Sequence, residues 1–184
     1  MKKQMKNKGE RIGAGGRLET LVDVNQIKRA VPPEILTSGE LGPYIGIAIY
    51  DYVTGISYMM NMPNFKSGKI DLDHKINEIK QTYLTPERLG AVATGNSALF
   101  SYPDIRERQK EDRRYVENIL KKHFKESHIR IEWMPNNYTA ELVMDTSEKE
   151  PRIIKRDLEG REHPLHERKY NFKKLKNLLK QIIL

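Results

Sequence analysis

The alternation of apolar and polar residues predicts several short strands in the first third of the chain. Residues 18–24 alternate as a half-exposed strand does, whereas residues 44–51 are nearly all apolar, which is typical of a strand buried on both faces. A short turn separates this apolar run from residues 56–62, and Pro43 and Pro63 bound the pair. The pattern therefore predicts an antiparallel β-hairpin.

Two stretches next to these strands carry helix or turn signals instead. Residues 26–30 predict a short helical turn, which ends before Pro32 and Pro33. Residues 37–43 (TSGELGP) combine glycine, serine and proline, so they predict an irregular turn that leads into the hairpin.

Farther along the chain, helices alternate with strands. Residues 70–83 have apolar side chains at helical spacing from Leu72 onward, and Asp71 or Asp73 is positioned to cap the first turn. Residues 104–124 predict a long charged helix with one apolar side. Short apolar runs predict strands at residues 89–93, 129–133, 140–144 and 152–155.

The last segment, residues 170–184, predicts an amphipathic helix. Its apolar residues recur at helical spacing and lysines cover the other side. The stripe consists of Phe172, Leu175, Leu178, Leu179, Ile182 and Ile183. We expect this helix to pack on the rest of the domain, because an isolated helix of this length is marginal in water.

The order of these elements predicts an α+β fold. A hairpin, a helix, a strand, a second helix, three strands and a final helix indicate a single-domain α/β sandwich of mixed β-sheet with flanking helices. We expect residues 1–16 to be a disordered basic arm, residues 17–166 to form the domain, and residues 167–184 to hold the C-terminal helix.

Composition adds limits on class and compartment. The chain has 184 residues, of which 38% are hydrophobic and 32% charged, enough for one core. No apolar run approaches the ~20 residues of a membrane span. The N-terminal lysines precede no apolar stretch of the secretory type, so we expect a cytoplasmic protein.

The positive net charge of +8 lies mainly at the two ends of the chain. Residues 1–12 and 161–184 carry net charges of +4 and +5, which leaves the middle near neutral. A nucleic-acid-binding domain usually carries its basic patch on the folded body. We therefore favour solvated ends, with binding to nucleic acid or another acidic surface as an alternative.

Cysteine and histidine content narrows the possible chemistry. The absence of cysteine excludes disulfides, thiolate metal sites and thiol nucleophiles. Five histidines are present: His74, His123, His128, His163 and His166. Only the last two are close in sequence, and Pro164 separates them, so we expect exposed loop histidines, no metal site and no cofactor.

Three segments together resemble a known protein family. They are LGPYIGIAIYDYVTGI at residues 41–56, GNSALF at residues 95–100, and MPNNYTAELVMDTSEKEPRIIKR at residues 134–156. Their order and spacing are similar to those of CheD, the chemoreceptor glutamine deamidases. The resemblance spans roughly residues 18–156 and implies a CheD-like domain.

The resemblance also implies where the family's active site falls. In CheD a cysteine thiolate attacks a glutamine side-chain amide, with a histidine as base and an upstream hydroxyl as orienting group. The cysteine position matches Tyr44 and the hydroxyl position matches Ser38. The histidine position matches Asn61, or Met59 if the hairpin turn is shortened by two residues. We expect none of these residues to be catalytic.

The resemblance therefore implies an inactive relative that acts through protein–protein contact, with a chemoreceptor or a CheC-type phosphatase as partner. The alternative is an amide hydrolase that uses other residues, with Ser38 as nucleophile. It lacks an obvious base, because His74, the nearest histidine in sequence, is expected to face solvent from its helix. The methionines Met59, Met60 and Met62 are interpreted as core, with a partner-binding patch as the alternative.

Overall fold

The computed structural model describes residues 9–12, 16–63, 71–97, 103–157 and 159–163. The two α-helices in this range are α1 (Leu72–Gln81) and α2 (Pro103–His123). The first six strands are β1 (Glu10–Ile12), β2 (Leu18–Leu21), β3 (Gln26–Ala30), β4 (Ile35–Glu40), β5 (Ile45–Asp51) and β6 (Ser57–Met62). The remaining strands are β7 (Leu89–Gly95), β8 (Ile129–Trp133), β9 (Tyr138–Asp145), β10 (Pro151–Asp157) and β11 (Glu162–His163).

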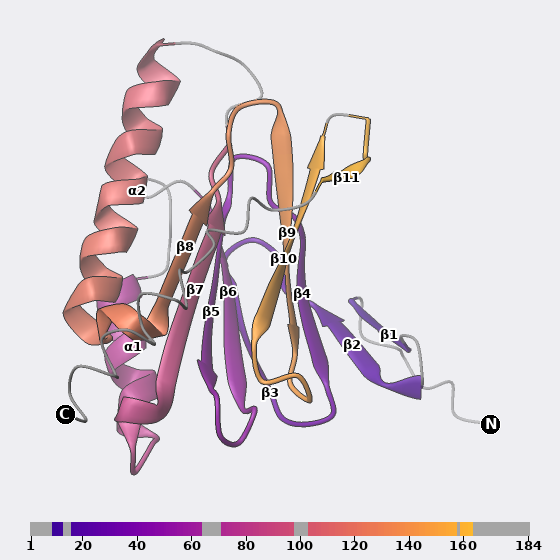
Figure 1. Cartoon of the computed structure of the whole chain (residues 1–184), viewed down its shortest axis with the longest axis vertical. Helices are drawn as coiled ribbons and strands as arrows, with labels where there is room; N and C mark the ends of the chain where they lie inside the picture. The colour runs from indigo at the N-terminus through magenta and orange to yellow at the C-terminus, as the bar shows by residue number, and fades with distance from the viewer. Residues whose placement is uncertain (1–8, 13–15, 64–70, 98–102, 158, 164–184) are drawn as a thin grey trace, which may run out of the picture.

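The strands form two mixed sheets. Sheet A has the order β1-β2-β4-β9-β10-β11, and sheet B has the order β3-β6-β5-β7-β8. Each contains one parallel pair, β2 with β4 in sheet A and β7 with β8 in sheet B. Both helices lie along the side of the sandwich that bears β7 and β8, and sheet A lies on the other side (Figure 1). The predicted α+β class is confirmed. The structure has two mixed sheets where one was predicted.

Two apolar clusters hold these layers together. One lies between the helices and sheet B and includes Ile47, Met60 and Leu120. The other lies between the two sheets and includes Met59 and Leu142. Alternation along β5 and β6 explains the split, since successive side chains of a strand point to opposite faces. All three methionines of β6 are buried, which agrees with their interpretation as core residues.

The hairpin, both internal helices and the later strands are confirmed. β5 and β6 pair antiparallel from Ile45 opposite Met62 to Tyr50 opposite Ser57. At the start of α1 the side chain of Asp71 accepts a hydrogen bond from the backbone N–H of His74 at 3.1 Å. The capping carboxylate satisfies a helix N–H that has no partner within the helix.

Two local predictions beside the hairpin are wrong. Residues 26–30 form strand β3 rather than a helical turn, because they pair antiparallel with β6 along their whole length. Residues 37–40 belong to strand β4 rather than to a turn, with β2 and β9 as neighbours. Gly39, at φ +61°, coincides with a register shift between Thr37 and Glu40, so the glycine marks a β-bulge.

The remaining observations concern the chain ends and one connection. The arm expected over residues 1–16 contains strand β1, which pairs with β2, so the prediction is wrong there. β8 belongs to sheet B and β9 to sheet A, so the connection between them passes from one sheet to the other. The helix predicted over residues 170–184 lies outside the described residues. Within those residues, no helix is long and apolar enough to cross a membrane.

Candidate functional site

The three positions that the resemblance to CheD singled out lie near one end of the hairpin. Ser38 is in β4, Asn61 is in β6, and Tyr44 directly precedes β5. Asn61 pairs with Gly46, two residues farther along than Tyr44, and the alternative position Met59 pairs with Ala48. Asn61 is therefore the position nearer to Tyr44, although it does not lie directly across from it.

The structure brings Ser38 and Asn61 together between the two sheets. The Asn61 Nδ2 group donates to the backbone oxygens of Val22 at 3.1 Å and of Ser38 at 3.3 Å. The Ser38 hydroxyl donates to the backbone oxygen of Gly39 at 2.8 Å and accepts from the backbone N–H of Leu142 at 2.9 Å. Both side chains are buried; Asn61 of sheet B bonds main chain of sheet A, whereas the Ser38 hydroxyl bonds main chain within sheet A. Ser38 thus lies within a strand and not in the irregular turn predicted over residues 37–43.

Leucine side chains pack the space beside this pair. A Cβ atom placed on Gly46 would lie 2.7 Å from Leu41 Cδ1 and 3.3 Å from Leu142 Cδ2. Leu41 is fully buried. Next to this packing, Asn61 Oδ1 is buried and accepts no hydrogen bond in the described part of the chain. Such a desolvated acceptor costs about 1–3 kcal/mol, so the amide is held here at some expense in stability.

Tyr44 sits at the rim of this region. Its side chain remains 37% exposed, and its backbone N–H donates to the backbone oxygen of Leu41 at 2.6 Å. Tyr44 thus leaves its ring partly in solvent, and Leu41 instead occupies the interior beside Gly46. A half-exposed tyrosine can contact a partner with both an apolar ring and a hydroxyl.

All three CheD-like segments meet at this end of the sandwich. The backbone N–H of Asn96, in the described part of the second segment, donates to the backbone oxygen of Tyr44 at 2.7 Å. The backbone N–H of Leu41 donates to the backbone oxygen of Ala140, in the third segment, at 2.8 Å. Segments separated by up to about a hundred residues thus surround one small region.

The described histidines all have other partners. His74, 69% exposed, forms an ion pair with Glu78, and His123 contacts Asp73. The His128 ring lies 5.6 Å from that of Tyr52, and His163 Nε2 is 2.8 Å from an oxygen of Asp157. His163 is in strand β11 rather than in a loop, and His166 lies outside the described residues. The solvent-facing position expected for His74 is confirmed.

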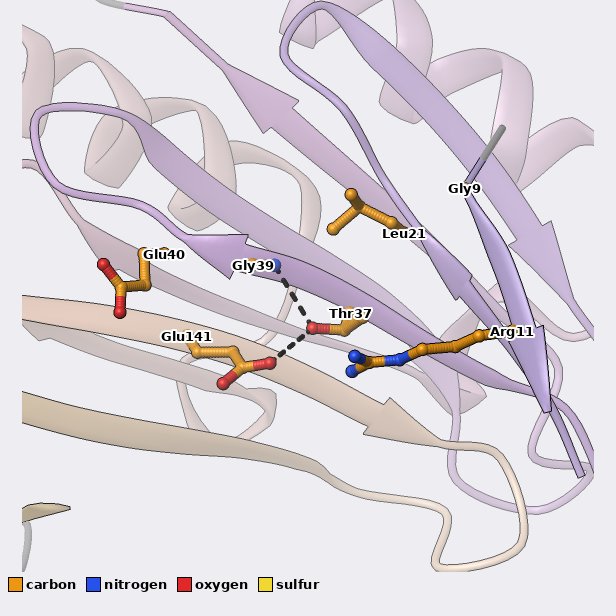
Figure 2. Close-up of a pocket in the computed structure, with 7 residues that line it drawn as sticks. All are labelled: Gly9, Arg11, Leu21, Thr37, Gly39, Glu40 and Glu141. Carbon is orange, nitrogen blue, oxygen red and sulfur yellow. Dashed lines mark hydrogen bonds between the residues drawn. The ribbon is translucent and has the colours of Figure 1, made fainter. Parts of the chain in front are cut away.

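A second candidate region is a hollow of about 440 Å³ on the outer face of sheet A, lined by Arg11, Thr37 and Glu141 among others (Figure 2). The Thr37 hydroxyl donates to Glu141 at 2.7 Å and accepts from the Gly39 N–H at 3.2 Å. Arg156 donates to the other Glu141 oxygen at 2.6 Å. Figure 2 shows Arg11, Thr37 and Glu141 pointing toward one another.

Charge in this hollow is largely balanced. Burial raises the pKa of Glu141, but the Thr37 hydrogen bond and Arg156 oppose it, and the pKa lies below its ordinary value. Arg11 forms an ion pair with Glu19. The carboxylate is therefore ionised and engaged, which suits a structural role better than proton transfer.

Sequence reasoning did not find this group, because its residues come from β1, β4 and β9 and match no motif. In the part of the chain that the structure describes, no group of three or more His, Asp or Glu side chains could hold a metal ion.

Comparisons with known proteins leave the family open. No known protein family matches this chain, and no curated protein matches it. The crystal structure of the Bacillus licheniformis hypothetical protein YfiH is similar, with 10% sequence identity and a TM-score of 0.42. The match covers 58% of this chain and about half, 49%, of that one. A likeness this weak carries no inference about function.

Proposed function

We propose that this chain is a CheD-like signalling domain of the cytoplasm that works through protein–protein contact and does not deamidate glutamine. One observation carries the proposal. The three CheD-like segments converge on the hairpin end, where the polar side chains at the matching positions are bonded to main chain. This arrangement supports a CheD-like domain that lacks the reactive groups of the family.

Each matching residue is poorly suited to the family chemistry. A tyrosine phenol has an ordinary pKa of ~10 and is a weak nucleophile without a strong base. An asparagine amide at the histidine position accepts no proton near neutral pH. The Ser38 hydroxyl already donates one hydrogen bond and accepts another, and the described histidines have partners elsewhere. These facts favour an interaction domain over a hydrolase that uses Ser38.

The partner is proposed to be a chemoreceptor or a CheC-type phosphatase, contacted through the rim that carries Tyr44. Partly exposed tyrosines often contribute strongly to interfaces, because they bury a large ring and keep a hydrogen-bonding group. Tyr52 offers a matched control, since it is 43% exposed and lies beyond the opposite end of β5.

The catalytic half of the proposal is tested by ammonia release. The purified chain is incubated with a glutamine-containing chemoreceptor peptide and compared with the peptide alone. We expect identical rates. Ammonia release above this background that disappears in Ser38→Ala would refute the proposal and support the hydrolase.

The binding half is tested by calorimetry with a purified CheC-type phosphatase and with the cytoplasmic part of a chemoreceptor. We expect one of them to bind, and Tyr44→Ala to weaken binding about tenfold, which corresponds to ~1.4 kcal/mol. Tyr52→Ala should leave the affinity unchanged. Failure of both proteins to bind, or equal loss in the two variants, would contradict the proposed surface.

A further inference from the structure

The edges of the two sheets differ in how well they are protected. In the described part of the chain, sheet A ends in the three-residue β1 and the two-residue β11. Sheet B ends in β3 and β8, which have five residues each. Very short edge strands offer little main chain for pairing, although β11 covers only Lys155 and Arg156 of β10 and leaves the rest of that strand open. The longer terminal strands are β3 and β8 of sheet B.

Both edges contact the helix-side apolar cluster, through Ile27 on β3 and Trp133 on β8, but their other surroundings differ. On β8, Trp133 donates from Nε1 to Glu117 of α2 at 2.7 Å, and the Arg113 guanidinium lies 5.5 Å from its ring centroid. On β3, Ile27 and Arg29 line a hollow of about 340 Å³. Tyr58 of β6 and Ile79 of α1 also line it. A groove therefore runs between α1 and the β3 edge.

One exposed cation lines this groove without an ion pair. Arg29 is exposed and forms no ion pair within the described residues, whereas Lys28 points to the other face of β3. Lys75 and Glu78 of α1 also line the groove and pair with each other. An exposed arginine beside an apolar floor favours a ligand that carries both a carboxylate and apolar side chains.

We propose that β3 binds an extended acidic segment of a partner protein, which adds a strand to sheet B. In this mode main-chain hydrogen bonds supply affinity, and pockets for alternate side chains supply specificity. Apolar side chains of the segment enter the groove against Ile27 and Ile79, and a neighbouring carboxylate pairs with Arg29. The site does not depend on the CheD-like assignment, because the edge, the groove and its charges come from the structure alone.

The test uses the full chain and a fluorescein-labelled hexapeptide of alternating valine and glutamate, followed by fluorescence anisotropy. We expect saturable binding that weakens at least tenfold when alternate peptide nitrogens are methylated, since methylation removes main-chain donors but keeps the side chains. A valine–lysine hexapeptide should not bind. Absence of valine–glutamate binding, or indifference to methylation, would overturn the proposal on the unaltered protein.

A pair of charge reversals locates the site. Arg29→Glu should weaken binding at least tenfold, whereas Arg114→Glu on the exposed part of α2 makes the same charge change and should have little effect. Circular dichroism confirms that both variants fold. Equal loss in the two variants would mean that net charge alone attracts the peptide, and the β3 site would be wrong.

Discussion

The two edge strands of sheet B have the same length but different surroundings. The helix-facing side of β8 packs against α2 through Trp133, Arg113 and Glu117. The helix-facing side of β3 borders a hollow, with Ile27 as part of its floor. α2, of 21 residues, supplies the contacts to Trp133, and α1, of 10 residues, lines the hollow beside β3.

This contrast separates a stabilising edge from an edge available for binding. Side chains packed between an edge strand and a helix contribute to folding, and their removal leaves a cavity. Side chains beside an open groove contribute less to folding, since water already reaches them. The same sheet can thus gain stability at β8 and keep an accessible strand at β3.

The largest expected effect concerns the two apolar side chains of this comparison. Trp133→Ala should lower the free energy of unfolding by about 2–3 kcal/mol, because a partly buried indole and its hydrogen bond to Glu117 are lost. Ile27→Ala should lower it by only about 1 kcal/mol, because its side chain already borders the hollow.

Urea denaturation followed by far-ultraviolet circular dichroism measures both variants, since this signal does not need the tryptophan. Equal losses in the two variants would show that β3 is packed as tightly as β8. The distinction between the edges would then fail.

A smaller effect is expected from the two arginines. Arg113 donates to the backbone oxygens of Asn96 at 2.7 Å and Met134 at 2.9 Å, and burial lowers its pKa. Arg113→Met should therefore cost about 1–2 kcal/mol of stability, because two acceptors lose their donor. Arg29→Met should change stability by less than about 0.5 kcal/mol, as surface substitutions usually do.

The same urea experiment checks this pair, and peptide binding gives the reverse ranking. The Arg29→Met variant should bind the valine–glutamate peptide more weakly than the unaltered chain. The Arg113→Met variant should bind it as the unaltered chain does. An unstable Arg29→Met variant would argue that this arginine has a structural role.

Local pattern was sufficient for most elements but not for β3 or β4. The hairpin could be predicted because its apolar runs and bounding prolines are local signals. β3 was missed because residues 26–30 become a strand through pairing with β6, which only the tertiary fold provides. In β4, Gly39 suggested a turn, whereas it occupies a bulge within a strand.

The candidate site was predictable only in part for the same reason. The resemblance placed Ser38, Tyr44 and Asn61 near the hairpin, and the structure joins Ser38 and Asn61 through a hydrogen bond. The packing of Leu41 over Gly46 could not be predicted, because it depends on how the two sheets meet. The hollow beside β3 likewise depends on where α1 ends relative to an edge strand.

The smallest effect concerns the contact that holds α1 beside α2 and so maintains one wall of the groove. Hydrogen bonds from Lys122 and then from His123 hold the pKa of Asp73 below its ordinary value of 3.8. The folded carboxylate is thus favoured, and its contribution to stability is fully present above the unfolded pKa of about 3.8 and is lost as pH falls through the lower folded pKa. Asp73→Asn should therefore be less stable than the unaltered chain above pH 5, by an amount that shrinks toward pH 2. Glu87→Gln, a matched neutralisation of an exposed residue after α1, should show no such convergence. Urea denaturation midpoints of the three proteins, measured at intervals of half a pH unit, test this expectation. A difference between Asp73→Asn and the unaltered chain that persists unchanged at pH 2 would mean that the ionised carboxylate does not hold α1 in place.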